Sequence, residues 1–155
     1  MRVALISDTH GQLRPEALAF VRGADHIVHA GDICDPAILD ALGELAPLTA
    51  VRGNNDHGAW AERLPATALV PLGGILLYAI HDLAEMDLDP PAAGVAVVVS
   101  GHSHIPVVHR RDGVVYVNPG SAGPRRFRLP ISVGELALRD GTVTARTVSL
   151  ETAAR

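Results

Sequence analysis

Histidines and hard oxygen donors recur in this sequence directly after short apolar runs. His102 and His104 stand two positions apart in "SGHSHIP", immediately after a run of valines. An alternating histidine pair just past a buried strand serves no packing purpose, because both ring nitrogens are polar. With the donors that follow the other apolar runs, the pair completes a set of seven: Asp8, His10, Asp32, Asn54, His81, His102 and His104.

The residue types in this set point to divalent metal ions. Imidazoles and hard oxygens without a thiolate suit Mn²⁺, Fe²⁺, Zn²⁺, Co²⁺ or Ni²⁺, and they argue against a structural cysteine-based zinc site. Seven donors are too many for one catalytic ion that must keep open positions. They fit two ions about 3.5–4 Å apart that share a bridging carboxylate, as in two-metal hydrolases.

Asp32 is the predicted bridge, because it emerges alone from a Gly-Asp turn between the other predicted strand ends. The remaining donors divide into Asp8, His10 and His104 for one ion, and Asn54, His81 and His102 for the other. A neutral amide ligand leaves the ion pair more electropositive than a third carboxylate would. The predicted site therefore favours an anionic substrate and lowers the pKa of a bridging water.

Alternating strands and helices would bring these donors together. Residues 2–7, 25–32 and 48–56 are predicted strands, and 14–23 and 36–45 are predicted helices between them. This order predicts a parallel sheet with right-handed crossovers. Because the carboxyl ends of parallel strands form one rim, donors that follow successive strands are expected to converge there.

The second half of the chain carries antiparallel signals. The apolar runs 67–74 and 75–82 meet at a glycine pair, and the two "RDG" triplets at 111–113 and 139–141 are typical of tight hairpins. A further buried strand is predicted over 95–104, after a connector with at most one helical turn. We therefore predict an α/β fold in which two mixed sheets pack face to face with helices on the outside.

Composition indicates one globular domain over residues 1–155. The chain is 48% hydrophobic and 19% charged, and its net charge of -4 gives no strong nucleic-acid signal. No apolar run approaches the ~20 residues of a membrane span, and no signal peptide is recognised. Cys34 is the only cysteine, which fits a reducing compartment, so a cytoplasmic location is expected. Cys34 itself is interpreted as a small apolar filler.

The order of these motifs resembles that of the calcineurin-like metallophosphoesterase superfamily. The matching segments are "DTH" at 8–10, "GD" at 31–32, "GNND" at 53–56, His81 and "GHSH" at 101–104. The short chain and the closing "NPGS" at 118–121 are similar to its small bacterial and archaeal branch, the YfcE-like phosphodiesterases. The non-catalytic retromer subunit of eukaryotes is a structural cousin of that branch.

This resemblance implies the metallophosphoesterase fold, a four-layer α/β/β/α sandwich of two mixed sheets flanked by helices. It also implies a dinuclear centre and hydrolysis of phosphoester bonds, and it assigns the same seven ligands. The hypothesis is a phosphodiesterase, favoured over a monoesterase, acting on a small phosphoester. A hydroxide that bridges the two ions would attack phosphorus in line. The resemblance favours Mn²⁺, with Fe²⁺, Zn²⁺ or Ni²⁺ as alternatives.

Two positions depart from the family pattern. Asn55 stands where many members have a histidine thought to protonate the leaving group, and an amide cannot act as that acid. His57, a metal-bound water, or a restriction to good leaving groups are the alternatives. His81 is followed by Asp82 and Leu83, where the family often has a glycine and another histidine. Both departures touch the substrate side of the site.

Several other polar residues are candidates for supporting roles. Arg125 and Arg126 could clamp a phosphate, against the alternatives of a solvated turn or a subunit contact. Asp56 is a candidate to orient a ligand imidazole. His29 is expected to be a buried structural histidine. The "NPGS" residues Asn118 and Ser121 are expected to shape the loop beneath the site: they lie in a tight turn.

Two other functions stay open at this point. One is a catalytically weak protein-interaction module that keeps the metallophosphoesterase fold, and the other is a hydrolase of nucleic-acid ends. The first is disfavoured because all seven ligand positions are filled, whereas the non-catalytic cousin lacks some ligand histidines. The acidic net charge disfavours the second. A homo-oligomer, either a dimer or a tetramer, is left open because apolar hairpin edges could pair.

Overall fold

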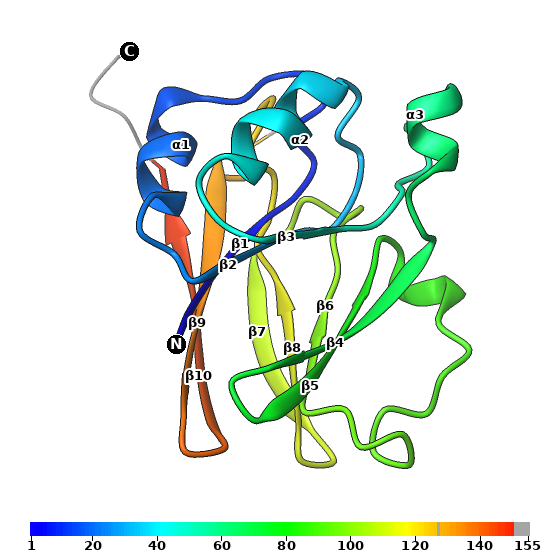
Figure 1. The fold of residues 1–155 in the computed structure, drawn as a ribbon, viewed down its shortest axis with the longest axis vertical. Coiled ribbons are helices and arrows are strands. Elements are labelled where there is room, and N and C mark those ends of the chain that lie inside the picture. The colour runs from blue at the N-terminus through cyan, green and yellow to red at the C-terminus, as the bar shows by residue number, and fades with distance from the viewer. Residues whose placement is uncertain (127, 151–155) are drawn as a thin grey trace.

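The computed structural model describes residues 1–126 and 128–150. Over these residues, two five-stranded sheets pack face to face (Figure 1). The first sheet has the order β10-β9-β1-β2-β3, with β1, β2 and β3 parallel and β9 and β10 antiparallel. Its strands are β1 (Arg2–Ile6), β2 (His26–His29), β3 (Leu48–Ala50), β9 (Ser132–Arg139) and β10 (Thr142–Ser149).

The second sheet is also mixed. Its order is β4-β5-β6-β8-β7, in which β5, β6 and β8 run parallel and the edge strands β4 and β7 run antiparallel to their neighbours. Its strands are β4 (Thr67–Leu72), β5 (Ile75–Ile80), β6 (Val97–Val99), β7 (Val107–Arg111) and β8 (Val114–Asn118). The parallel strand β6 is buried on both faces, which explains its uninterrupted valines.

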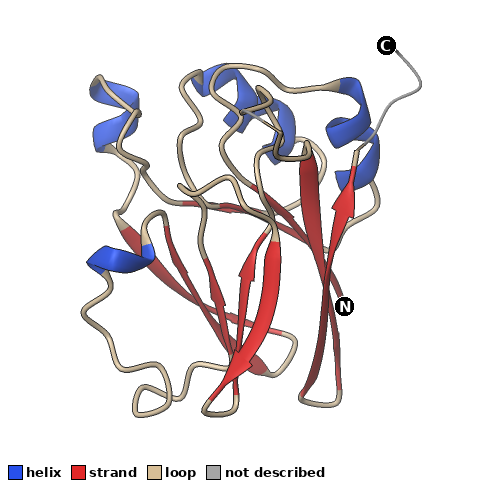
Figure 2. Ribbon diagram, turned by 180° about the vertical axis from the view of Figure 1, so that it is seen from behind, coloured by secondary structure: helices blue, strands red, loops and turns tan. Residues whose placement is uncertain are grey.

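Helices cover the outer face of the first sheet. These are α1 (Pro15–Val21) and α2 (Pro36–Gly43), and each begins with a proline, which suits the first helical position. They pack on a cluster that includes Ile6, Ile27 and Leu42. Figure 2 shows the α-helices gathered at one end of the molecule. In the described part of the chain, no helix is long and apolar enough to cross a membrane.

The two inner faces of the sheets form the central core, which includes Leu5, Leu77 and Leu136. On the outer face of the second sheet, the covering layer comes from η1 (Leu83–Glu85), a single 3₁₀ turn, and the connector that follows it. Met86 and Leu88 of this connector pack against the sheet. The predicted fold class is confirmed, and its fourth layer consists of this short turn and connector.

All three predicted hairpins are present, and each turns through two residues of positive φ. The pairs are Gly73 and Gly74 (53° and 85°), Asp112 and Gly113 (52° and 79°), and Asp140 and Gly141 (51° and 78°). Positive φ at both central residues is the type I′ pattern, whose twist matches that of paired strands. Figure 1 shows the β7–β8 and β9–β10 turns at the end of the molecule opposite α1 and α2.

The structure differs in part from the predicted elements between residues 48 and 62. Residues 48–56 were expected to form a strand ending in a polar turn; the polar loop is present, but the strand is shorter than expected and ends at Ala50. A short helix that was not predicted, α3 (Ala59–Glu62), follows this loop. Four residues are too few to show helical periodicity, and Trp60 is held by packing against the cluster under α1 and α2.

Candidate metal centre

The seven predicted donors meet at one end of the sandwich. They follow the carboxyl ends of parallel strands in both sheets: β1 and β2 in the first sheet and β5 and β6 in the second, with Asn54 in the loop after β3. Two loops from β1 and β6 lie next to each other, because the backbone N–H of His102 donates to Asp8 Oδ2 at 3.1 Å. The predicted convergence at a strand-end rim is therefore present.

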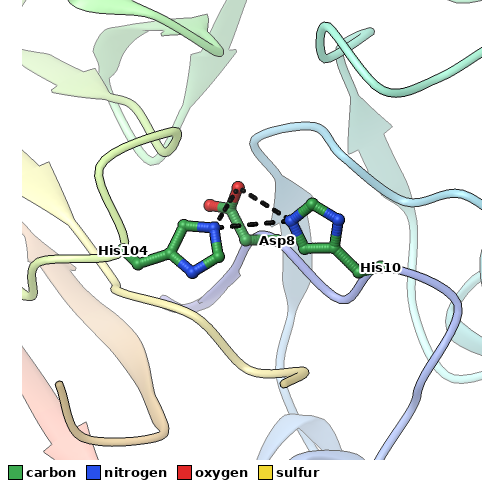
Figure 3. Close-up of side chains that lie close together, drawn as sticks. All are labelled: Asp8, His10 and His104. Atoms are coloured by element: carbon green, nitrogen blue, oxygen red, sulfur yellow. Dashed lines mark hydrogen bonds and ion pairs between the residues drawn. The ribbon is translucent and has the colours of Figure 1, made fainter. Parts of the chain in front are cut away.

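Asp8, His10 and His104 form the first donor group. Asp8 Oδ1 lies 3.4 Å from His104 Nε2 and 3.8 Å from His10 Nε2, and the two imidazole nitrogens are 3.4 Å apart. Figure 3 shows these side chains pointing toward one another from separate loops. Such a spacing brings three metal-binding atoms around one point.

Asn54, His81 and His102 form the second donor group. Asn54 Oδ1 lies 3.0 Å from His81 Nε2 and 3.1 Å from His102 Nδ1. Asp32 stands between the groups: its Oδ2 is 3.3 Å from His81 Nε2 and 3.6 Å from His10 Nε2. One carboxylate oxygen thus faces both donor groups, which is the position a bridging ligand requires.

The burial of Asp8 gives a second reason to expect divalent cations at these donors. Asp8 Oδ1 is buried, and it accepts no hydrogen bond from the described residues. A buried carboxylate oxygen without a partner is costly, and a cation at this point would satisfy it. Asp32, His81 and His104 are also buried, whereas the His102 side chain is 44% exposed. The centre is therefore closed beneath and open on the His102 side.

The backbone at the centre is unusual. Eight non-glycine residues of the described chain have positive φ, and five of them are predicted metal ligands: Asp8 (55°), His10 (46°), Asp32 (58°), His102 (72°) and His104 (64°). This left-handed conformation costs an ordinary residue roughly 1–2 kcal/mol. Such strain is retained where the surrounding structure fixes it, and it concentrates at functional sites. The loops are therefore shaped to aim side chains rather than to minimise backbone strain.

The His81 ring is oriented by a main-chain carbonyl. Its Nδ1 lies 2.7 Å from the oxygen of Ala30, and a carbonyl can only accept, so Nδ1 carries the proton. Nε2 is then the ring nitrogen that faces Asp32 and Asn54. A histidine that donates its other N–H to a carbonyl is a common arrangement for metal ligands.

Asn55 holds the carboxylate of Asp32 in place. Its backbone N–H donates to Asp32 Oδ1 at 2.8 Å and its side-chain amide to Oδ2 at 3.0 Å. Burial raises the pKa of Asp32, but hydrogen bonds from His81 and Asn55 outweigh burial and hold that pKa well below its ordinary value. The carboxylate is therefore charged, as a metal bridge must be.

Asp56 is a buried anchor for two site loops. Its carboxylate accepts four backbone N–H groups, at 2.8 to 3.0 Å, from Asp32, Ile33, Cys34 and Gly53. The prediction that Asp56 orients a ligand imidazole is wrong, because its hydrogen bonds within the described residues all come from main-chain N–H groups of these loops. It positions the Asp32 loop against the Asn54 loop instead.

Glycines in the motifs allow the loops to approach closely. A Cβ at Gly53 would overlap the backbone nitrogen and carboxylate of Asp32. A Cβ at Gly101 would overlap Ser7 Oγ and lie 2.7 Å from Asp8 Oδ2. Only glycine fits these positions without displacing a donor.

Asn118 and Ser121 of the "NPGS" segment lie beneath the centre and hold its loops, as predicted. Asn118 Nδ2 donates to the oxygen of Gly101 at 2.9 Å, and Ser121 Oγ donates to the oxygen of Asp8 at 3.1 Å. Two partners were not predicted. Ser7 Oγ donates to Asp8 Oδ2 at 2.7 Å, and Asp82 Oδ2 lies 3.7 Å from His102 Nε2.

The remaining candidates lie around the centre rather than in it. His57 is exposed and lines a hollow with Arg52 and Glu62, apart from the donor groups. Arg125 and Arg126 are exposed, and Phe127 lies outside the described residues. Burial lowers the pKa of His10, and the positive charge of Arg126 adds to this lowering. Arg126 is thus within electrostatic reach of the first donor group.

Because His29 is buried, we expect the fold to lose stability in acid. His29 is fully buried between Thr9 Oγ1, at 3.0 Å, and the Gly31 N–H, at 3.1 Å, and burial lowers its pKa to about 4. In the unfolded chain His29 binds a proton below about pH 6.5, whereas in the folded protein it does so only near pH 4. The contribution of His29 to the free energy of unfolding is therefore complete above about pH 6.5 and is lost as the pH falls toward 4. Urea unfolding of the metal-free protein should show about 3 kcal/mol less stability at pH 4 from this group.

Comparing variants isolates that contribution from other titrating groups. In His29→Gln, the free energy of unfolding should fall much less between pH 7 and pH 4 than in the wild type. In His109→Gln, at an exposed position, it should fall as much as in the wild type. Equal pH dependence in wild type and His29→Gln would contradict the prediction.

Comparison with known proteins shows to which family the chain belongs. Residues 1–141 match the calcineurin-like phosphoesterase superfamily domain. The chain therefore belongs to this superfamily of metal-dependent enzymes, and the prediction of a hydrolase acting on phosphoester bonds is confirmed.

Two named relatives agree with this class, and a solved structure shares the fold. The chain is 32% identical to the probable metallophosphoesterase MJ0623 of Methanocaldococcus jannaschii over 90% of this chain and 77% of that protein. It is 29% identical to the phosphodiesterase YfcE of Escherichia coli K12 over 94% and 97%, respectively. The crystal structure of Vps29 from Entamoeba histolytica with Zn²⁺ superposes with a TM-score of 0.71 at 21% identity, covering 97% and 100%.

Proposed function

We propose that this chain hydrolyses small phosphodiesters, in preference to monoesters, with two divalent ions held by the seven donors. Asp8, His10 and His104 hold one ion, Asn54, His81 and His102 hold the other, and Asp32 bridges them. The observation that carries this proposal is the placement of Asp32 Oδ2 within 3.3 Å of His81 and 3.6 Å of His10. The buried, partnerless Asp8 Oδ1 supports the same assignment.

When bound, two such ions would lower the pKa of a water molecule, so that it attacks phosphorus as hydroxide, and would neutralise charge on the phosphoryl oxygens. The chain fixes the geometry for that chemistry. Asn55 holds both oxygens of Asp32, and the Ala30 carbonyl fixes the tautomer of His81. Because its side-chain amide is committed to Asp32, Asn55 is a positioning residue and not the acid for the leaving group.

Arg126 is proposed to bind the substrate on the side of the first donor group. Its charge acts on His10, so a phosphoryl oxygen beside His10 would feel the same positive potential. Arg125, its exposed neighbour in the chain, is proposed to share this role. His57 stays a prediction as leaving-group acid, since it lines a different hollow.

Two hollows beside the centre support a preference for diesters. One of about 170 Å³ includes His102 in its wall, and another of about 230 Å³ includes Asn54 and His81. A phosphodiester has two organic substituents on its phosphorus, and each hollow can receive one. A monoester would leave one of them unused. The relative named phosphodiesterase YfcE is consistent with this choice.

Removal of metal tests the proposal directly. Exhaustive treatment with a chelator should abolish hydrolysis of bis(p-nitrophenyl) phosphate, because the donors cannot polarise the phosphoryl group without the ions. Mn²⁺, Fe²⁺, Zn²⁺ and Ni²⁺ are then restored one at a time, and Mn²⁺ is expected to restore the most activity. Titration calorimetry should give two ions per chain.

A matched substrate comparison completes this test. The diester should be cleaved with a higher kcat/KM than p-nitrophenyl phosphate, which has the same leaving group but only one substituent. Activity that persists without any metal would refute the two-ion proposal. Faster cleavage of the monoester would refute the diester preference alone.

An interaction module is the second candidate function. The fold similarity to Vps29 is compatible with it. Two bound ions per chain with no cleavage of either substrate would favour this alternative over the enzyme.

A further inference from the structure

An apolar pocket of about 170 Å³ opens beside the second donor group. Leu83 of η1 lines one side, and Val107, His109 and Tyr116 of strands β7 and β8 line another. His102 belongs both to this wall and to the donor group. A molecule bound at the donors can therefore extend into the pocket without crossing another part of the protein.

The strand side of the pocket carries a rigid aromatic pair. His109 and Tyr116 are directly opposite each other on β7 and β8, and their rings stack with centroids 5.0 Å apart and an interplanar angle of 3°. Val107 is two residues before His109 and therefore lies on the same face of the strand. Aromatic faces and edges of this kind attract further flat rings.

The charges of the pocket exclude the phosphate itself as its occupant. The described lining contains no lysine or arginine, and it includes the carboxylate of Asp82. Asp82 Oδ2 lies 3.7 Å from His102 Nε2, at the border with the donor group. Phosphoryl oxygens are thus drawn to the donors and repelled from the pocket, which leaves the organic substituent of an ester to enter it.

We propose that this pocket binds a flat aromatic substituent, an aryl or nucleobase group, of the phosphoester whose phosphoryl group lies at the donors. The size fits, because a cavity of about 150 Å³ lined by apolar side chains accepts benzene. This inference rests on the proposed function and specifies its substrate class. The pocket makes the enzyme selective for esters of aromatic alcohols or nucleosides over esters of small alkyl alcohols.

Binding of two phosphonates to the Mn²⁺-loaded protein tests the inference without turnover. Phenylphosphonate and methylphosphonate offer the same head group to the donors and differ only in the substituent. Calorimetry should give a Kd about tenfold lower for phenylphosphonate, as expected from burial of one apolar ring.

Filling the pocket should remove this preference. Val107→Trp and Leu83→Trp place an indole into it from opposite walls, and each should reduce the ratio of the two Kd values to below about twofold. Both positions are exposed, at 43% and 38%, so the larger side chain does not enter the core. Circular dichroism and thermal unfolding confirm that each variant is folded.

Val108→Trp is the matched control. Val108 is the next residue of the same strand, 37% exposed, and its side chain points to the opposite face. This variant should keep the tenfold ratio.

The possible results distinguish a failure of the pocket assignment from a failure of the proposed function. Equal Kd values for both phosphonates on the wild-type protein, or an unchanged ratio in both Val107→Trp and Leu83→Trp, would overturn the pocket assignment and leave the metal centre standing. Failure of both phosphonates to bind the Mn²⁺-loaded protein would instead overturn the proposed function, and the pocket assignment with it.

Discussion

Asp32→Asn is expected to lower kcat/KM for bis(p-nitrophenyl) phosphate by at least about 10³-fold while the metal-free protein stays folded. Asp32 Oδ2 faces both donor groups, at 3.3 Å from His81 and 3.6 Å from His10. An amide at this position keeps the shape but removes the negative charge that two cations would share. Both ions should therefore bind more weakly, and the stoichiometry measured by calorimetry should fall below two.

The metal-free protein should be less stable in this variant but still folded. Hydrogen bonds from His81 and Asn55 hold the pKa of Asp32 below its ordinary value, so the charged carboxylate contributes to stability at neutral pH and the amide loses that contribution. His102→Ala should likewise lose activity and keep the fold, because its side chain is 44% exposed.

Asp112→Asn is the control for Asp32→Asn. Asp112 has the same residue type and nearly the same left-handed backbone, with φ of 52° against 58°, but it lies in the β7–β8 hairpin. Its substitution should leave both activity and metal stoichiometry within experimental error. Turnover in Asp32→Asn equal to that in Asp112→Asn would exclude Asp32 as the bridge.

The position of the donors could be predicted because each follows an apolar run that forms a buried strand. Sequence order alone places Asp8, Asp32 and His81 after strands, and parallel pairing then puts those strand ends on one rim. The hairpins were predictable for a similar local reason, since Asp112-Gly113 and Asp140-Gly141 are residue pairs that tolerate positive φ.

Long-range hydrogen bonds to the main chain could not be predicted. Asp56 meets the backbone of residues 32–34 only after the sheet has formed, and a backbone N–H carries no signal of residue type. The left-handed conformation of His10, His102 and His104 was equally hidden, because positive φ is uncommon for any residue other than glycine, even for histidine, which adopts it more often than most. These features depend on tertiary structure, so they appear only in the folded site.

The covering of the second sheet followed from local sequence better than from the fold class. The fold class implied a helical fourth layer, whereas the connector over 83–94 was predicted to hold at most one helical turn before Pro90 and Pro91, and the structure has that single turn. The result is a single turn, Leu83–Glu85, and an irregular connector. This thin layer leaves Leu83 exposed at the edge of the aromatic pocket, so the departure from regular structure falls where substrate selectivity is proposed.

Asp56→Ala is expected to destabilise the metal-free protein by at least about 4 kcal/mol and to weaken Mn²⁺ binding about 10–100-fold. The substitution leaves four N–H groups without their acceptor: those of Asp32, Ile33, Cys34 and Gly53. Asp56 is 5% exposed, so water replaces the carboxylate poorly. Urea unfolding and calorimetric titration with Mn²⁺ measure the two effects.

Asp35→Ala provides the matched comparison for Asp56→Ala. Asp35 also accepts a backbone N–H, that of Ala37 at 2.9 Å, but only this one and at the exposed start of α2. Its loss should cost about 1 kcal/mol and leave metal affinity unchanged. A smaller loss of stability in Asp56→Ala than in Asp35→Ala would contradict the anchoring role.

Saturating metal distinguishes anchoring from ligation. Asp56 touches the loops and not the donor atoms, so raising the Mn²⁺ concentration should restore most of the kcat of Asp56→Ala, because bound ions pull the same loops together. Asp32→Asn should not recover in the same titration, since its missing charge belongs to the site itself. If excess Mn²⁺ failed to restore kcat in Asp56→Ala, Asp56 would have to act on the reacting groups rather than on the loops that carry them.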